Sequence, residues 1–119
     1  MEKGFSVFGT TRDIITADTS NLEKLGILNE IEILTTCISD FRSLLLTLEK
    51  TNPEFIFHLA GQSSVGLSFA LPFEAIDSIL LSTLNLLECV KFFNKKIKIF
   101  IPCSSDCFGS STKENPSDE

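Results

Sequence analysis

The chain has 119 residues, of which 43% are hydrophobic and 22% are charged, a composition typical of one globular domain rather than of a disordered chain. Its formal net charge is −6, which argues against a nucleic-acid-binding surface, because such surfaces carry clustered Lys and Arg. The sequence contains no Tyr, no Trp and a single histidine, His58. A metal site with two histidines, and any mechanism that needs a catalytic tyrosine, are therefore excluded for this chain acting alone.

Four cysteines raise the question of a metal site or of disulfides. No two of them form a C-x-x-C pair, and Cys103 and Cys107 stand four positions apart. This spacing argues against both a zinc site and a disulfide framework. No signal peptide is recognised, so we expect reduced, mostly buried thiols and no metal in a cytoplasmic protein. The longest apolar stretch, residues 79–93, is interrupted by polar and charged side chains and is not expected to span a membrane.

The first third of the chain predicts two short strands separated by polar sequence. Residues 5–9 have the pattern of a strand that ends at a glycine, and residues 31–34 form a second β-type run. Residues 10–21 are predicted as a loop, and residues 21–28 as a short helical turn.

A helix is predicted after Asp40, whose side chain suits the N-cap position. Four apolar residues then fall on one face at helical spacing: Phe41, Leu44, Leu45 and Leu48. The Asn52-Pro53 dipeptide is expected to end this helix.

The second half predicts a strand, a helix and a final strand. Residues 55–60 form a continuous apolar run, which suits a parallel strand covered on both faces. Residues 61–71 are predicted as a loop, and Pro72 opens a helix that closes at Asn94-Lys95-Lys96. Its apolar positions, expected to face the core, are Phe73, Ile76, Leu80, Leu84, Leu87 and Val90. Residues 97–101 form the last predicted strand.

This alternation of strands and helices predicts an α/β fold with βαβ units and a parallel sheet. Ligands of such sheets bind beyond the carboxyl ends of the strands. The four loops that follow the strands are also polar and contain Gly or Ser: residues 9–13, 35–40, 60–66 and 102–109. The coincidence predicts a ligand site at this edge of the sheet.

The same loops carry four motifs in order: Gly9-Thr10-Thr11-Arg12-Asp13, Ser39-Asp40-Phe41-Arg42-Ser43, His58-Leu59-Ala60-Gly61-Gln62-Ser63-Ser64-Val65-Gly66 and Ser104-Ser105-Asp106-Cys107-Phe108-Gly109. They resemble the GDP-mannose 4,6-dehydratases, a branch of the NAD-dependent epimerase/dehydratase family of extended short-chain dehydrogenases. The resemblance runs from about residue 4 to residue 108. It implies a partial Rossmann-like parallel sheet with flanking helices.

The resemblance also implies that both ends of the family's pattern are missing. The family begins with a strand and a Gly-rich loop, which have no counterpart here, and its Tyr-x-x-x-Lys pair and sugar-nucleotide domain would follow Glu119. Residues 1–119 would then be an incomplete NAD(P)-binding Rossmann domain with a disordered or truncated tail over residues 110–119. Because the missing strand is central in the order 3-2-1-4-5, we expect the isolated chain to be unstable, to self-associate or to borrow a strand.

The resemblance assigns cofactor contacts to three loops. Arg12 would contact the 2′-phosphate of NADP, to which a guanidinium is well suited. Ile38 would lie near the adenine. The segment that passes under the ribose and phosphates on the nicotinamide side would consist of Leu59, Ala60, Gly61, Gln62 and Ser63. Its small residues would let the backbone approach the cofactor closely.

Ser104 and Asp106 stand at the positions of the family's catalytic Ser/Thr and acidic residue. The family oxidises C4 of the hexose, removes the C5 proton, expels water from C6 and returns hydride to C6. Ser104 would hydrogen-bond the C4 oxygen, and Asp106 would move the C5 proton. His58 is interpreted as a packed strand residue. Without the Tyr and Lys partners, the chain is expected to be inactive alone.

Other interpretations stay open. The chain could be a non-catalytic partner module that complements another polypeptide, or a fragment of another nucleotide-sugar epimerase or dehydratase. A redox or metal protein that uses the four cysteines is a third possibility. By resemblance, the substrate would be GDP-mannose, and the helix that contains Phe73 would contribute to a dimer face; no membrane or nucleic-acid partner is expected.

Overall fold

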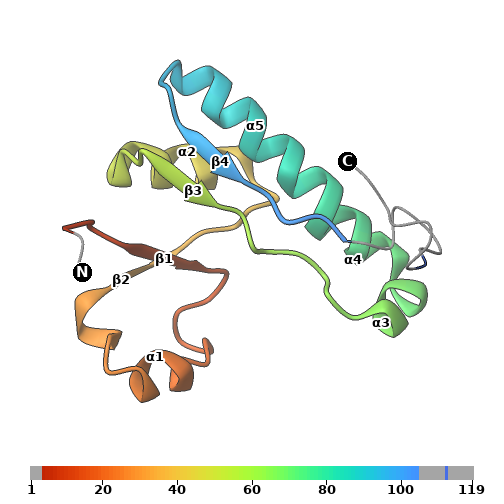
Figure 1. Ribbon diagram of the computed structural model, residues 1–119. Helices are drawn as coiled ribbons and strands as arrows, with labels where there is room; N and C mark the ends of the chain where they lie inside the picture. The colour runs from red at the N-terminus through yellow and green to blue at the C-terminus, as the bar shows by residue number, and fades with distance from the viewer. Residues whose placement is uncertain (1–3, 105–111, 113–119) are drawn as a thin grey trace.

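The computed structural model describes residues 4–104 and 112, and its strands alternate with helices as the sequence predicts (Figure 1). The elements in chain order are β1 (Phe8–Thr11), α1 (Ser20–Lys24), the 3-10 turn η1 (Leu28–Glu30), β2 (Glu32–Thr35), α2 (Phe41–Thr51), β3 (Phe55–Phe57), α3 (Val65–Ala70), α4 (Pro72–Ile76), the π-helical turn η2 (Asp77–Leu81), α5 (Ser82–Phe93) and β4 (Lys98–Phe100). The α/β class is confirmed.

The strands form two parallel pairs. β1 pairs with β2, with Phe8 opposite Glu32, and β3 pairs with β4, with Phe55 opposite Lys98. No hydrogen-bonded ladder joins β1 to β3 among residues 4–104, and Figure 1 shows the two pairs as separate ribbons. This division matches the expectation that a central strand is not among the described residues.

Helix α2 begins and ends where the sequence predicts. The Asp40 carboxylate accepts a hydrogen bond from the Ser43 backbone N–H at 2.8 Å, which satisfies one of the N–H groups that a helix leaves without a partner. Asn52 adopts the left-handed conformation, with φ 43°, and donates its N–H to the Leu48 carbonyl at 2.8 Å. Local capping therefore fixes the length of α2.

Replacing Asp40 with alanine is expected to lower the free energy of unfolding by about 1 kcal/mol, because the Ser43 N–H loses its acceptor. Asp40→Asn keeps a side-chain acceptor and is expected to lower it by less than half of that. Urea titration followed by circular dichroism measures both changes. Equal losses in the two variants would contradict the capping role.

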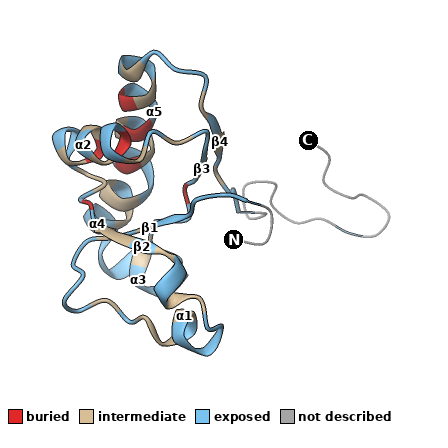
Figure 2. Cartoon of the chain, turned by 90° about the vertical axis from the view of Figure 1, so that its left-hand side faces the viewer, coloured by how far each residue is buried: buried red, intermediate tan, exposed pale blue. Residues whose placement is uncertain are grey.

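The core lies where α2 meets α5. Its buried apolar residues are Leu44, Leu48, Leu86 and Cys89, and Figure 2 shows buried segments in red on both helices. Ile56 of β3 and Ile99 of β4 pack against this cluster. Helices α2 and α5 therefore cover the same face of the β3–β4 pair.

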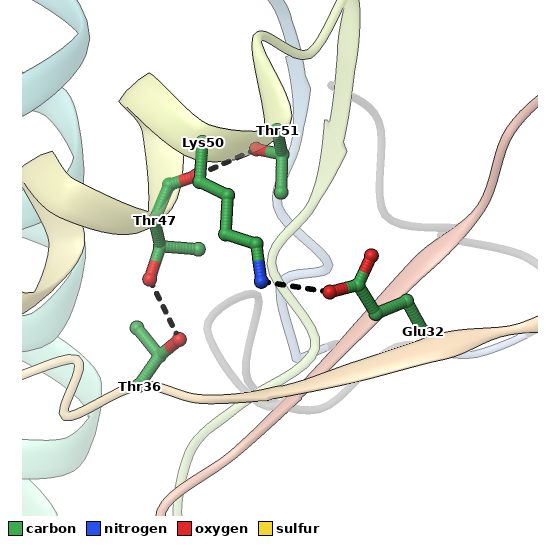
Figure 3. Close-up of polar contacts among 5 residues, drawn as sticks. All are labelled: Glu32, Thr36, Thr47, Lys50 and Thr51. Carbon is green, nitrogen blue, oxygen red and sulfur yellow. Dashed lines mark hydrogen bonds and ion pairs between the residues drawn. The ribbon is translucent and has the colours of Figure 1, made fainter.

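Helix α2 also holds the β1–β2 pair (Figure 3). The hydroxyls of Thr36 and Thr47 lie 2.8 Å apart, and Thr36 is buried. Lys50 forms an ion pair of 2.7 Å with Glu32 of β2, but both side chains are more than half exposed, so this pair contributes little to stability. Since α2 contacts β2 and also packs on β3 and β4, it is the structural link between the two strand pairs.

The predicted core face of the helix over residues 72–93 is confirmed only for Val90, which packs against the core, and is wrong for the other five residues. The apolar stripe Phe73, Ile76, Leu80, Leu84 and Leu87 is 44–78% exposed. The inward face instead carries Ser82, Leu86 and Cys89. Small side chains there allow α5 to approach α2 and β3, and no described segment covers the Leu-rich face.

Several predicted boundaries differ from the structure. β1 spans Phe8–Thr11 rather than residues 5–9, because pairing with β2 sets its extent and draws in two β-branched threonines. The predicted loop over residues 61–71 contains α3, whose N-cap Ser64 accepts the Leu67 N–H at 3.3 Å. The strands predicted over residues 55–60 and 97–101 are shorter, at Phe55–Phe57 and Lys98–Phe100.

The prediction of mostly buried thiols is wrong for the described cysteines. Cys37 and Cys103 are exposed, because each lies in a loop beyond a strand, and only Cys89 is buried. Burial, followed by the negative charge of Asp40, raises the pKa of the Cys89 thiol. Cys107 and the predicted tail, apart from residue 112, lie outside the described residues.

Candidate functional site

The loop after β1 places Arg12 at the carboxyl end of the first strand pair. Thr11 lies opposite Thr35, and its carbonyl accepts the Thr36 N–H at 2.8 Å. Arg12 is exposed and forms no ion pair within residues 4–104. The guanidinium is therefore available to an anion from solvent.

The neighbouring Asp13 carboxylate is held within its own loop. It accepts hydrogen bonds from the Ile15 backbone N–H and the Thr16 hydroxyl, both at 2.9 Å. These bonds, that of Ile15 first, lower the pKa of Asp13. Asp13 thus stays ionised without pairing with Arg12.

The loop after β2 is held by the helical segment 72–93, which consists of α4, η2 and α5 in succession. The Asn85 amide donates to the Ser39 carbonyl at 2.8 Å and lies 3.5 Å from the Ile38 carbonyl. The Ser39 hydroxyl donates to the Asp77 carboxylate at 2.6 Å. Ile38 and Ser39 are therefore hydrogen-bonded to residues 38–47 positions later in the chain.

The loop after β3 rests on the same helical segment. The Gln62 N–H donates to the Ser78 hydroxyl at 3.2 Å. Gly61 has φ +152°, and a Cβ at this position would lie 3.3 Å from Ile79. The positive φ favours glycine here, and the close contact with Ile79 leaves little room for a side chain.

Two of the predicted cofactor loops therefore converge on adjacent residues, Asp77 and Ser78, at the start of η2. A π-helical turn places one extra residue in a helix, and such turns are frequent at functional sites. The turn orients both side chains toward loops that follow different strands. The loops after β2 and β3 therefore share neighbouring supports on one helical segment.

The other described residues of the predicted site follow the ends of β3 and β4. The Leu59 side chain is 70% exposed although it is apolar, and Ala60 and Ser63 are also exposed. Ser104, also exposed, is four residues beyond Phe100 in β4, as Gly61 is beyond its register partner Phe57 in β3. Asp106 lies outside the described residues.

These features fit a dinucleotide that lies across the ends of the strands. Exposed Leu59 and Ala60 offer an apolar surface and Arg12 a cation, while Gly61 lets this loop lie close against Ser78 and Ile79 of η2. A shallow hollow of about 240 Å³ between β2 and α2 is lined by Leu34, Thr35, Ser43, Leu46, Thr47 and Lys50. None of the predicted cofactor residues lines it.

His58 is buried at the end of β3 rather than presented at the edge. Its Nε2 lies 3.4 Å from the hydroxyl of Ser82, which donates to the Ser78 carbonyl at 2.6 Å. Desolvation lowers the pKa of His58. The fold therefore holds a neutral imidazole.

The stability of the chain is expected to fall as the pH drops below about 6.5, the pKa of an unfolded histidine. The unfolded chain then binds a proton that folded His58, with its lower pKa, resists, so the loss grows until the folded-state pKa is reached. His58→Gln is expected to flatten the curve between about pH 5 and 7. Urea midpoints across this range measure it, and an unchanged slope would contradict the assignment.

Neither a metal site nor a membrane span is found in the described residues. No group of three or more His, Cys, Asp or Glu side chains there could hold a metal ion. Across residues 4–104, no helix has the length and apolar character needed to cross a membrane.

Comparison with known proteins establishes the family. The family model described as GDP-mannose 4,6 dehydratase matches residues 1–119. The chain belongs to the GDP-mannose 4,6-dehydratase family. The resemblance seen in the four loop motifs is thereby confirmed.

Individual relatives include dehydratases and epimerases. The chain is 31% identical over 121 aligned residues to GDP-mannose 4,6 dehydratase 1 of Arabidopsis thaliana, covering 93% of this chain and 34% of the relative. It is 36% identical over 66 residues to the UDP-glucose 4-epimerase of Mycoplasma pneumoniae, covering 56% of this chain and 20% of the relative. The chain thus spans a fifth to a third of the length of these curated relatives.

Solved structures agree with the fold. The UDP-glucose 4-epimerase of Bifidobacterium longum, in complex with NAD+ and UDP, superposes with a TM-score of 0.76 at 26% identity, covering 98% of this chain and 36% of that one. The chain therefore shares its fold with this nucleotide-sugar epimerase, whose structure holds NAD+ and UDP.

The residues that hold the loops were not predicted from the sequence. Asp77, Ser78 and Asn85 make the supporting hydrogen bonds. Ser78, Ser82, Asn85 and Cys89 recur at helical spacing. A polar and small-residue face on an otherwise apolar helix was the signal that could have found them.

Proposed function

We propose that this chain is part of the cofactor domain of an NADP-dependent enzyme that converts GDP-mannose to GDP-4-keto-6-deoxymannose. The observation that carries the proposal is the convergence of the loops after β2 and β3 on Asp77 and Ser78, at the edge where parallel sheets bind ligands. Residues 1–119 are then an incomplete NAD(P)-binding domain, inactive alone, in a cytoplasmic protein.

The residues have distinct roles in this proposal. Arg12 binds the 2′-phosphate that distinguishes NADP from NAD, and Ile38 packs near the adenine. Leu59, Ala60, Gly61, Gln62 and Ser63 line the ribose and phosphates on the nicotinamide side. The nicotinamide ring, when bound, supplies hydride acceptance and return.

Two residues act on the sugar. Ser104 donates a hydrogen bond to the oxygen at C4, and Asp106 takes the proton from C5 as water leaves C6. The Tyr-x-x-x-Lys pair of the family has no counterpart here, and this sequence contains no tyrosine. Turnover therefore needs groups that this chain does not supply.

The substrate assignment rests on the family. The family model carries the GDP-mannose description and matches the whole chain, while relatives include UDP-glucose 4-epimerases and a CDP-glucose 4,6-dehydratase. We therefore favour GDP-mannose over other nucleotide sugars. A non-catalytic role in a complex is the second candidate, favoured by the exposed apolar stripe that starts at Phe73, which supports self-association.

A chimera tests the proposed function. This chain replaces the matching third of the Arabidopsis dehydratase, and the purified chimera is assayed with NADP and either GDP-mannose or UDP-glucose. We expect conversion of GDP-mannose alone, and loss of at least about 100-fold in kcat in the Ser104→Ala chimera with NADP binding retained. A folded chimera that binds NADP but converts UDP-glucose instead would overturn the substrate.

A further inference from the structure

The adjacent side chains of Asp77 and Ser78 bond to two different loops. The Asp77 carboxylate accepts a hydrogen bond from the Ser39 hydroxyl at 2.6 Å, and both residues are partly buried. The Ser78 hydroxyl accepts one from the Gln62 N–H at 3.2 Å. Neighbouring side chains of a helix point roughly a quarter turn apart, so one step along η2 changes the loop that is reached. Each loop therefore has its own anchor.

A charge-assisted hydrogen bond fixes the loop after β2. A hydroxyl that donates to a carboxylate forms a shorter and stronger bond than two neutral groups do, and the 2.6 Å between Ser39 and Asp77 is typical of such a bond. The Ser39 carbonyl also accepts the Asn85 amide at 2.8 Å. Ser39 is thus held through both its side chain and its backbone, and the adjoining Ile38 is held with it.

The loop after β3 depends on a series of bonds that begins in the protein interior. Ser82 is buried beside His58, and its hydroxyl donates to the Ser78 carbonyl at 2.6 Å. Ser78 in turn accepts the Gln62 N–H, and the Gln62 side-chain oxygen accepts the Ser64 N–H at 3.0 Å. Loss of the Ser78 hydroxyl would therefore release the loop at Gln62 and leave the bonds of Asp77 in place.

We propose that Asp77 and Ser78 are positioning residues for two separate halves of the dinucleotide. Asp77 sets the affinity for the adenosine half through Ser39 and Ile38, and Ser78 sets the affinity for the nicotinamide half through Gln62. Each acts through the loop that it holds. The inference rests on the proposed function, which gives these loops their cofactor contacts, and adds that the two halves are tuned independently from one helical segment.

Amide hydrogen exchange of the full chain tests the two anchors in the absence of cofactor. Asp77→Ala is expected to speed exchange by at least about threefold at the Asp40 N–H, which closes a turn in the loop after β2, and to leave Gln62 unchanged. Ser78→Ala is expected to speed exchange at Gln62 by a similar factor and to leave Asp40 unchanged. Glu74→Ala is the control, because it removes an exposed carboxylate from the same helical segment.

The chimera with the Arabidopsis dehydratase then separates the two halves of the cofactor. Dissociation constants are measured by NMR titration with adenosine 2′,5′-bisphosphate and with nicotinamide mononucleotide. We expect Asp77→Ala to weaken only the first probe and Ser78→Ala only the second, each by about 3- to 10-fold, as the loss of one hydrogen bond predicts. Asp77→Asn and Ser78→Thr keep an acceptor and are expected to stay within about twofold of the unmodified chimera.

Three results would overturn the proposal. Each alanine variant could weaken both probes equally or neither, the exchange changes could appear in both loops at once, or the conservative variants could lose as much affinity as the alanine variants. An effect of Glu74→Ala equal to that of Asp77→Ala would also assign the effect to charge alone. Failure of the folded, unmodified chimera to bind either probe would contradict the proposed function, whereas binding that these variants do not alter would contradict only this inference.

Discussion

The Leu86→Ala variant is expected to lose about 2–5 kcal/mol of stability and to be largely unfolded at about 25 °C. Leu86 is only 3% exposed and is one of four buried apolar residues in the described core. Removing its side chain leaves a cavity between α2 and α5, the contact that positions both helices on β3 and β4. Few other buried contacts can offset this loss. Urea unfolding followed by circular dichroism measures it.

Leu87 provides the matched control, because it is the next residue of α5 and is 44% exposed. Leu87→Ala is expected to change the free energy of unfolding by less than about 1 kcal/mol. Both variants should be measured at two protein concentrations. A loss for Leu87→Ala as large as that for Leu86→Ala, present only at the higher concentration, would show that the stripe is covered by self-association.

Replacing Arg12 with alanine in the Arabidopsis chimera is expected to weaken NADP binding by about 10- to 100-fold, as the loss of a hydrogen bond to a charged group predicts. NAD binding should change by less than about threefold, because NAD lacks the 2′-phosphate. The guanidinium is exposed and unpaired within residues 4–104, so its removal leaves no buried partner behind. Isothermal titration with both dinucleotides measures the ratio.

Lys24→Ala in the same chimera removes an equal charge from the end of α1 and should leave the NADP to NAD ratio unchanged. An equal loss of NADP affinity in both variants would show that Arg12 acts only through its positive charge and not through a specific contact. If Arg12→Ala weakened the binding of NADP and of NAD equally, Arg12 would contact the pyrophosphate rather than the 2′-phosphate.

Local signals predicted the elements best. Helix α2 follows from Asp40 as its N-cap, Asn52 at its end and the spacing of Leu44 and Leu48, all of which act within the segment. Helix α3 was missed because its Gly- and Ser-containing sequence resembles a loop until the Ser64 cap is recognised. Strand limits depend on partners elsewhere in the chain, so β1 was placed about three residues early.

The helix over residues 72–93 shows where hydrophobic spacing is insufficient. Its regular apolar stripe predicted a buried face, yet the buried residues of α5 are Ser82, Leu86 and Cys89. This face is turned inward because its small side chains let α5 pack closely on α2. It also brings the Asn85 amide to the Ser39 carbonyl. Similarly, the loop motifs indicated where the site lies, whereas the supporting bonds from Asp77 and Asn85 join residues 38–47 positions apart. Such long-range pairs have no local signature.

Titration of the 119-residue chain and of the Arabidopsis chimera with NADP tests the central claim most directly. If the chain is part of a cofactor domain, calorimetry should detect saturable NADP binding by the chimera and no saturable binding by the chain alone. Absence of binding by a folded chimera would contradict the cofactor site, and binding by the chain alone as tight as that by the chimera would contradict its incompleteness.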